Sequence, residues 1–351
     1  KELLRHPEVV AQRFLERVKE DPSSWRQVQR RHSQTTTATC SMSAKARDLA
    51  ADPYELVIID EAGRATPLEL LVPMVQGKRV VLIGDHRQLP PLVEDEVISA
   101  LEQNQPSVVK LDEETLFGEL FNCLPRDNLE RLSVQYRMHE HIGQMVSRLF
   151  YKPHGEVLRS HFSGDRARDR LPAYGVLDNQ PVTFIDTEDS PGSTPYDNLE
   201  ERRVVLALLT AFAESPSVRR LESPVRLGVI CAYARQRELL LEEFDALCKK
   251  RSESWDQSGL QVEIKTIDAV QGREYPVTIV CLVRRDGLPG FLAAPNRINV
   301  ALSRAQRQLI ILGTRDSLTS AKMSEGAPHM PRLVAYCQEL RRIKPWSEVR
   351  L

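Results

Sequence analysis

The sequence lacks the features that mark membrane, secreted and zinc-binding proteins. No apolar run approaches the ~20 residues that a membrane-spanning helix needs, and charges interrupt residues 1–20, where a signal peptide needs an apolar stretch. The 6 cysteines are scattered and no two form a Cys-x-x-Cys pair, which argues against structural zinc and against a disulfide framework. We therefore expect a cytoplasmic protein with no membrane partner.

The sequence also lacks an excess of either charge. Lysine and arginine together number 48 against 49 aspartates and glutamates, which leaves a net charge of −1. This balance gives no sign of nucleic-acid binding by the molecule as a whole, so any such surface must come from a local arrangement of charges. With 351 residues, the chain is long enough for two domains that each bury a core.

The sequence does contain two short apolar runs that end in acids. Residues 56–59 lead into Asp60 and Glu61, and residues 80–83 lead through a glycine into Asp85. Parallel sheets present ligand-binding groups at the carboxyl ends of their strands. The acids are therefore candidates for a site, although an acid pair after a strand is also a common way to cap the next helix.

The residue types that follow these runs suit phosphate chemistry. Mg²⁺ prefers hard oxygen ligands and often takes one or two carboxylates together with phosphate oxygens, which suits Asp60. Glu61 would orient or deprotonate an attacking water. Gln88, which lies close after Asp85, would hydrogen-bond a terminal phosphate or that water. The combination favours a nucleotide-hydrolysing site over a simple helix cap.

Five motifs of the chain resemble, in the same order, the motifs of superfamily 1 helicases. They are Asp60-Glu61-Ala62-Gly63, Gly84-Asp85-His86-Arg87-Gln88-Leu89, Val134-Gln135-Tyr136-Arg137-Met138-His139, Thr266-Ile267-Asp268-Ala269-Val270-Gln271-Gly272-Arg273-Glu274 and Asn299-Val300-Ala301-Leu302-Ser303-Arg304-Ala305. The chain most resembles the branch that contains the nonsense-mediated-decay helicase, senataxin and the immunoglobulin mu-binding helicase. The resemblance implies an α/β fold of two RecA-like parallel-sheet domains, ATP hydrolysis with Mg²⁺ in the cleft between them, and movement along single-stranded DNA or RNA.

One feature of this family is missing from the chain. No Gly-x-x-x-x-Gly-Lys-Ser/Thr occurs, although this Walker A loop cradles the phosphates and precedes the Asp-Glu motif by a long interval in the family. We therefore expect the chain to be the carboxy-terminal portion of a longer protein whose amino-terminal region carries the loop. The first RecA-like domain would then be incomplete, and the chain alone would hydrolyse ATP poorly.

Alternating strand and helix patterns predict a parallel α/β organisation in three segments. Residues 1–34 form a helical segment, interpreted as the remnant of an inserted arm, residues 35–126 the carboxy-terminal part of the first RecA-like domain, and residues 127–351 the second RecA-like domain. Besides the two apolar runs, a strand is expected over residues 35–40 at the start of the first domain. The strands expected in the second domain are 182–186, 225–231, 263–266, 277–283 and 309–313. The expected helices are about 139–150, 199–214, 234–250 and 297–305. His139 and His141 do not share a helix face, so a helix start is favoured there over a metal site.

In the second domain, the resemblance implies three residues that meet ATP. Arg304 would act as an arginine finger, Arg137 would meet the γ-phosphate, and Tyr136 would stack on adenine. A guanidinium suits this work because it grips phosphate oxygens bidentately and stays protonated at physiological pH. Each arginine taken alone could equally be one half of a surface ion pair.

The resemblance also implies supporting positions around the nucleotide. Asp85 belongs to the second acidic motif, and Glu274 would contact the ribose or the water around the metal. Gly272 would give its turn backbone freedom. Arg237 matches the strand-to-helix turn of an intermediate motif, where the neighbouring Tyr233 could instead be an ordinary cap on the core.

Three further positions are implied to act on the nucleic acid. Thr266 and Asp268 match the segment that couples the nucleotide cleft to the bound strand in the family. Thr39 would contact the backbone of the strand through its hydroxyl group, and the alternative for Thr39 is a place in an ordinary buried strand.

Two other functions remain as alternatives. The first is a catalytically inactive helicase-like module that binds nucleic acid or serves as a scaffold, which the missing loop would permit. The joint presence of Asp60, Glu61, Gln88, Arg137 and Arg304 argues against it, because a dead site has no chemical need for all five. The second is a nuclease that uses the acids directly with a metal, but the dispersed acids and lysine expected of such a site are not apparent. The sequence leaves the choice between DNA and RNA open.

Overall fold

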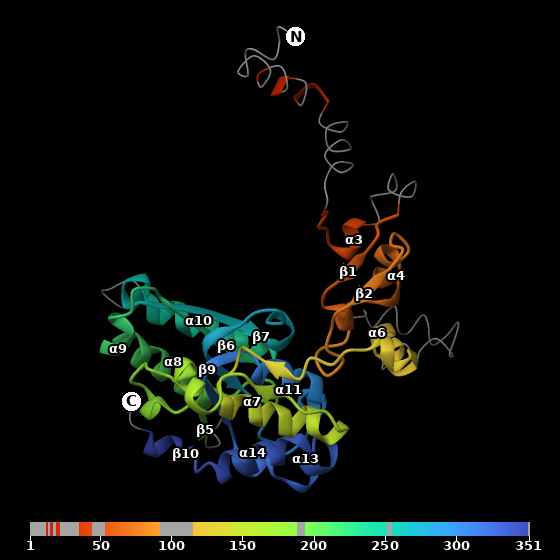
Figure 1. Ribbon diagram of the computed structural model, residues 1–351. Coiled ribbons are helices and arrows are strands. Elements are labelled where there is room, and N and C mark those ends of the chain that lie inside the picture. Colours follow the sequence, from red (N-terminus) through yellow and green to blue (C-terminus); the bar gives the residue numbers. More distant parts are fainter. Residues whose placement is uncertain are drawn as a thin grey trace. The chain divides into compact units, whose positions relative to one another are not determined.

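The computed structural model describes residues 12, 15–16, 19–21, 35–43, 53–91, 115–187, 194–250 and 255–349 (Figure 1). Its contacts divide the chain into two compact units, which consist of residues 1–60 with 67–82 and of residues 61–66 with 83–351. The predicted boundary at residue 126 stays a prediction. So does the inserted arm over residues 1–34, most of which lies outside the described residues.

The first unit contains a pair of parallel strands, β1 (Val57–Ile59) and β2 (Val80–Leu82), with Val57 opposite Val80. Helix α4 (Pro67–Met74) lies between the two strands in the chain, and the short helix α3 (Cys40–Ser43) packs against α4. Along β1 the side chain of Ile59 is buried and 60% of Ile58 is exposed, which is the alternation of a strand with one covered face. Both strands predicted from the apolar runs are confirmed.

The strand predicted over residues 35–40 is wrong. Residues 35–39 are exposed and have no regular secondary structure, and Cys40 begins α3. The Thr39 hydroxyl accepts a hydrogen bond from Met42 N at 3.3 Å, and its carbonyl accepts one from Ser43 N at 3.0 Å. β-branched residues favour strands mainly where neighbours pack against them. Here the hydroxyl caps a helical turn instead.

The second unit is built on a six-stranded sheet in which every pairing is parallel. The order across the sheet is β10-β5-β9-β8-β6-β7. The strands are β5 (Val182–Asp186), β6 (Val225–Cys231), β7 (Leu260–Thr266), β8 (Tyr275–Cys281), β9 (Ala305–Gly313) and β10 (Ile343–Pro345). A separate short parallel pair joins β3 (Val134–Gln135) to β4 (Arg159–Ser160).

Helices cover both faces of this sheet (Figure 1). The helices of the unit are α6 (Leu116–Cys123), α7 (Glu140–Val146), α8 (Leu199–Glu214), α9 (Pro216–Arg219), α10 (Ala234–Lys250), α11 (Pro295–Leu302), α12 (Arg315–Leu318), α13 (Ala321–Gly326) and α14 (His329–Glu339). Alternate strand residues serve two cores. Val229 and Ile279 pack with α8 and α10, whereas Ile230 and Val280 pack with α7, α11 and α14. The predicted α/β fold with a parallel sheet is confirmed.

Helix α7 begins where the sequence predicted a helix rather than a metal site. His139 is its N-cap, and the Nδ1 atom of His139 accepts a hydrogen bond from His141 N at 3.1 Å. Burial and the neighbouring His141 lower the pKa of His139 to about 4, so its ring is neutral at pH 7 and able to accept. After Val146 the helix widens into a π-helical turn over Ser147–Tyr151.

Most other predicted elements are confirmed. Strands β5 and β6 and helices α8 and α10 have the predicted ends. Strand β9 begins at Ala305 and β7 at Leu260, both earlier than predicted, because polar side chains such as Gln261 interrupt the apolar pattern at their starts. Strand β8 lies two residues earlier, at 275–281 instead of 277–283. Within the described residues, no helix is both long enough and apolar enough to cross a membrane.

Candidate functional site

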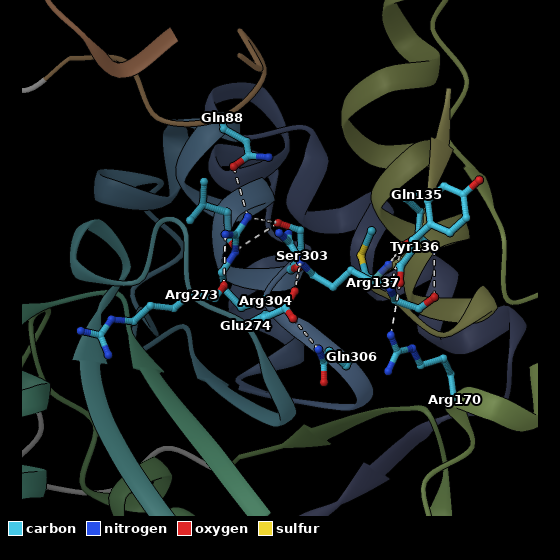
Figure 2. A network of polar contacts seen from close by, with 12 residues as sticks. Gln88, Gln135, Tyr136, Arg137, Arg170, Arg273, Glu274, Ser303, Arg304 and Gln306 are labelled. Carbon is cyan, nitrogen blue, oxygen red and sulfur yellow. Dashed lines mark hydrogen bonds and ion pairs between the residues drawn. The ribbon is translucent and has the colours of Figure 1, made fainter. Parts of the chain in front are cut away.

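Arg304 lies directly before β9 and is 1% exposed. Its Nε donates to Val300 O at 3.0 Å and its Nη1 to Arg273 O at 3.3 Å. Its Nη2 donates to Gln88 Oε1 at 3.1 Å and to Ser303 Oγ at 2.9 Å (Figure 2). The guanidinium plane is therefore fixed by acceptors on every nitrogen.

Charged groups of both signs act on the guanidinium of Arg304. Burial and the neighbouring Arg137 guanidinium lower the pKa of Arg304 to about 10, and the charges of Glu61 and Asp85 oppose this shift. Arg304 consequently stays protonated at pH 7. The opposing acids lie on the two acidic motifs, so those motifs face Arg304 closely enough to act on its charge.

Arg137 shares the same network (Figure 2). Its Nε donates to Glu274 Oε2 at 2.9 Å and its Nη1 to Ser303 O at 3.3 Å. The second carboxylate oxygen of Glu274 accepts a hydrogen bond from Gln306 Nε2 at 2.8 Å. One end of the Arg137 guanidinium is thus anchored by a carboxylate that is itself oriented by a neighbour.

The turn that presents Arg137 is shaped by Gln135. The Oε1 atom of Gln135 accepts hydrogen bonds from Arg137 N at 2.9 Å and Met138 N at 2.6 Å. Its Nε2 donates to Ser160 Oγ at 2.7 Å. Gln135 stands in the Tyr-Arg motif but was given no role by the sequence, and its work is to fold the loop between β3 and α7.

Gln88 and Asp85 form a compact turn. Asp85 Oδ1 accepts a hydrogen bond from Arg87 N at 2.8 Å, and Asp85 Oδ2 accepts one from Gln88 Nε2 at 3.0 Å. The turn passes close to the first motif, because a Cβ atom on Gly84 would stand 2.8 Å from Gly63 N. Only glycine allows the two motifs to approach this closely.

Glu61 has a left-handed backbone conformation, with φ 55° and ψ 34°. Its Oε2 accepts a hydrogen bond from Gln271 Nε2 at 3.1 Å. The next amide, Ala62 N, donates to Ile83 O at 2.8 Å. A non-glycine residue in this conformation stores strain that surrounding contacts must offset, and such strain at an acid beside Arg304 is typical of a functional position.

Tyr136 is 61% exposed. Its ring stacks on that of His161 with 4.4 Å between centroids and 32° between planes. Its carbonyl accepts a hydrogen bond from Arg170 Nη2 at 3.2 Å (Figure 2). A ring supported by one stack and largely open to solvent is able to take a second planar group.

Three other predicted residues make different contacts. The Nε of Arg237 donates to Ile264 O at 3.4 Å, so Arg237 pins the start of α10 to β7. Thr266 ends β7, and Asp268 in the following turn lies 3.8 Å from Arg297 Nε. These residues gather at the carboxyl end of β7, which is where parallel sheets present binding groups.

The remaining predicted residues are Gly272 in the second unit and Asp60 and Thr39 in the first unit. Gly272 has φ 75°, and a Cβ atom there would meet nothing within 4 Å, so its conformation and not its surroundings calls for glycine. Asp60 and Thr39 belong to the first unit, where Asp60 is exposed and directly follows β1.

The second unit therefore brings together six of the predicted residues. They are Glu61, Asp85, Gln88, Arg137, Glu274 and Arg304. Five of them share one hydrogen-bond network, and Glu61 acts on it through its charge. Two guanidinium groups, a primary amide and three carboxylates suit an anionic ligand rich in oxygen, because guanidinium groups bind phosphate oxygens strongly. A carboxylate beside them is able to take a proton from water.

Residues 112–316 match a family model described as an AAA domain, and residues 12–96 match a second model with the same description. The chain is 30% identical over 298 residues to the regulator of nonsense transcripts 1 homolog of Neurospora crassa, covering 82% of this chain and 25% of that protein. It is 29% identical over 297 residues to helicase SEN1 of Saccharomyces cerevisiae, covering 81% and 12%. It is 28% identical over 280 residues to an uncharacterized ATP-dependent helicase of Methanocaldococcus jannaschii, covering 77% and 37%.

The chain belongs to the superfamily 1 helicases. It lies in the branch of the nonsense-mediated-decay helicase, which confirms the resemblance carried by the five motifs. This helicase chain spans about a quarter of the Neurospora protein's length.

The sequence predicts that Asp60 binds Mg²⁺. The part of the chain that the structure describes contains no group of three or more His, Cys, Asp or Glu side chains arranged to hold a metal ion. Mg²⁺ in nucleotide sites does not need such a group, because phosphate oxygens and waters supply most of its ligands. A single exposed carboxylate at the end of β1 fits that donor set.

Proposed function

We propose that this chain is part of an ATP-dependent helicase or translocase that acts on single-stranded nucleic acid and hydrolyses ATP in the cleft between two RecA-like domains. The observation that carries the proposal is the hydrogen bond from Arg304 Nη2 to Gln88 Oε1 at 3.1 Å, which joins two motifs 216 residues apart. The names of two relatives also support the proposal, since one is called an ATP-dependent helicase and the other a helicase.

In this proposal Glu61 is the general base. Its carboxylate accepts a hydrogen bond from Gln271 and acts on the charge of Arg304, so it stands where a water between an acid and a cation would be polarised. Gln88 orients that water or the terminal phosphate through its amide. Positioned general bases typically contribute 10²- to 10⁴-fold to a rate.

The two arginines supply positive charge to the transferring phosphoryl group. Arg304 is the proposed arginine finger and Arg137 the second γ-phosphate contact, with Glu274 fixing the plane of Arg137. Fixed cations at the place where negative charge develops lower the barrier because they need no reorganisation during the reaction. Tyr136 offers its exposed ring to the adenine base.

Asp60 is the proposed ligand of Mg²⁺. The bound ion supplies charge neutralisation on the phosphate oxygens. Asp85 accepts a hydrogen bond from the amide of Gln88, so its proposed role is to orient Gln88. Because the chain contains no Walker A motif, we expect the 351 residues alone to turn over ATP poorly.

The bound nucleic-acid strand is proposed to contact Thr266, Asp268 and Thr39. Hydroxyl and backbone groups at such positions would grip phosphate and sugar and leave the bases unread. Binding of this kind weakens as salt concentration rises.

The test is Glu61→Gln in the full-length protein. We expect strand-stimulated ATP hydrolysis to fall by at least about 100-fold, while strand binding measured by fluorescence anisotropy stays within about twofold. The amide keeps the size of the side chain and removes its basicity. Glu325→Gln, the same change at an exposed position of α13, is the matched control and should leave both measurements unchanged.

Unchanged strand-stimulated hydrolysis in Glu61→Gln would exclude this helicase mechanism. A wild-type protein that binds the strand but hydrolyses no ATP would instead be the inactive binding module.

A further inference from the structure

Tyr151 is a residue that no motif drew attention to, yet it reaches the proposed site. It ends the π-helical turn that follows α7, and its ring packs against the core beneath α7, α11 and α14. Its hydroxyl donates a hydrogen bond to Asp85 Oδ2. π-helical turns rotate a side chain out of its α-helical direction and are frequent at functional sites.

The hydroxyl of Tyr151 has only one possible direction. Asn299 Nδ2 donates to Tyr151 Oη at 3.3 Å and to Arg87 O at 2.8 Å. The oxygen of Tyr151 is therefore an acceptor toward Asn299, so its proton points at Asp85. Burial and the nearby Asp85 raise the pKa of Tyr151 above its ordinary value, which keeps the proton in place at every physiological pH.

Asp85 passes this orientation on to Gln88. The Oδ2 atom of Asp85 accepts from both Tyr151 and Gln88 Nε2, the second contact being 3.0 Å long. Holding the amide nitrogen of Gln88 at a carboxylate leaves its oxygen toward Arg304 Nη2, at 3.1 Å. The flipped amide would set oxygen against oxygen at Asp85 and nitrogen against nitrogen at Arg304, so both neighbours exclude it.

We infer that Tyr151 is a positioning residue for ATP hydrolysis, whose hydroxyl holds Asp85 so that Asp85 in turn fixes the amide of Gln88. The inference rests on the proposed function. Without the hydroxyl, Asp85 loses one of its donors and is able to rotate, and Gln88 then samples orientations that do not serve the reacting phosphate or water.

The test is Tyr151→Phe in the full-length protein, because it removes one oxygen and keeps the ring in the core. We expect kcat for strand-stimulated ATP hydrolysis to fall about tenfold, the size of one lost hydrogen bond, and KM for ATP to change less than about twofold. The matched control is Tyr336→Phe. Tyr336 is 4% exposed and its hydroxyl donates to His141 O at 2.9 Å. His141 has no proposed role in hydrolysis, so the loss of this hydrogen bond should leave kcat unchanged.

A double variant separates positioning from a merely structural role. In a Gln88→Ala background, Tyr151→Phe should lower kcat no further, because the residue through which Tyr151 acts is gone. Asp85→Asn should reproduce the fall in kcat of Tyr151→Phe, since asparagine has one acceptor oxygen and cannot accept from Arg87 N on one side and from Tyr151 and Gln88 on the other. If Tyr151→Phe folds poorly, the fall in kcat of Asp85→Asn tests the same chain of hydrogen bonds.

Three results would overturn the inference. They are a kcat for Tyr151→Phe equal to that of wild type, a fall in kcat no larger than that of Tyr336→Phe, or an effect of Tyr151→Phe that persists in full after Gln88→Ala. The control that separates this failure from failure of the helicase proposal is Glu61→Gln. If Glu61→Gln abolishes hydrolysis while Tyr151→Phe does not lower it, only the role of Tyr151 is lost.

Discussion

Arg304 uses all three of its nitrogen atoms within the protein, which constrains how it could serve as an arginine finger. Two of its acceptors are the backbone carbonyls of Val300 and Arg273, and a third is the hydroxyl of Ser303. Only the contact with Gln88 reaches a side chain that is itself proposed to meet phosphate. A phosphate oxygen would most readily replace that contact, so ATP binding would exchange one partner of Arg304 and leave the others in place.

Glu201 is a second residue whose environment governs its chemistry. It lies in the first turn of α8, is 0% exposed, and its Oε1 accepts a hydrogen bond from Val283 N at 2.9 Å. Its Oε2 has no hydrogen-bond partner within the described residues. Burial raises the pKa of Glu201 well above its ordinary value, although the hydrogen bond from Val283 N and the charge of Arg285 oppose the shift. The native protein therefore keeps a proton on Glu201 at pH values where an unfolded glutamate has already lost it.

This proton makes stability depend on pH. Unfolded glutamate titrates at about 4.3, so above that pH the unfolded chain has lost a proton that the native protein keeps. The contribution of Glu201 to the free energy of unfolding should consequently fall as pH rises toward its raised native pKa, by up to about 1.4 kcal/mol per pH unit. We expect Glu201→Gln to gain stability relative to wild type as the pH rises above about 5, measured by urea unfolding at a series of pH values.

The control for this measurement is Glu214→Gln. Glu214 is the exposed last residue of the same helix, so its substitution should shift the curve by the same small amount at every pH. A difference between wild type and Glu201→Gln that does not change with pH would show that Glu201 is ionised in the native protein.

At the scale of elements, α8 illustrates how one cap serves both a helix and the protein core. Asn198 is its N-cap and is 0% exposed, and its Oδ1 accepts from Glu200 N and Glu201 N at 3.1 Å each. Gln236 on α10 pairs with both backbone groups of Asn198, at 2.8 Å and 3.2 Å. The start of α8 is therefore fixed to α10 as well as capped.

We expect Asn198→Ala to lower the free energy of unfolding by about 2 kcal/mol, the upper end for a lost N-cap, because two amides lose their acceptor in a buried place. Urea unfolding at pH 7 measures this. Thr115→Ala removes the N-cap of α6, where Thr115 Oγ1 accepts from Gly118 N at 3.0 Å. The loss there should be about 1 kcal/mol, and equal losses in the two variants would argue against the added cost of burial at Asn198.

The elements that the sequence predicted best are those whose signals are local. Helix α8 follows an asparagine cap, and β5 and β6 are apolar runs that end at turn residues. The strand over residues 35–40 failed because β-branched residues report strand preference without reporting whether a partner strand exists. Local sequence determines a cap or a buried run, but pairing depends on what the rest of the chain brings alongside.

The candidate site was predictable to the extent that its residues lie in motifs. Gln88, Arg137 and Arg304 were found in this way, and the structure joins them in one network. The sequence did not predict a role for Tyr151, because a single tyrosine at the end of an apolar helix is typical of a core residue. Glu201 escaped for a similar reason, since an acid in the first turn of a helix is usually a favourable partner of the helix dipole and only tertiary packing buries it.

At the scale of the whole molecule, the two units differ in how much core they have. The second unit buries both faces of a six-stranded sheet, with Leu227, Ile279 and Ile310 all 0% exposed. In the first unit, the described residues form a two-stranded sheet, and Ile58 and Val81 are 60% and 43% exposed. A two-stranded sheet with little cover has few contacts to hold its backbone hydrogen bonds closed.

Hydrogen exchange on the 351-residue chain should therefore divide along the two units. We expect peptides from β6, β8 and β9 to exchange at least about 100-fold more slowly than peptides from β1 and β2, because the former open only with the core and the latter by local opening. Mass spectrometry of peptic fragments after deuterium labelling at pH 7 resolves the two groups. Helix α10, whose buried Leu240 packs on the sheet of the second unit, serves as the internal reference and should exchange with the slow group. Equal protection of β1 and β8 would mean that the first unit is stabilised as strongly as the second, and the low exposure of a side chain would then be a poor guide to stability in this chain.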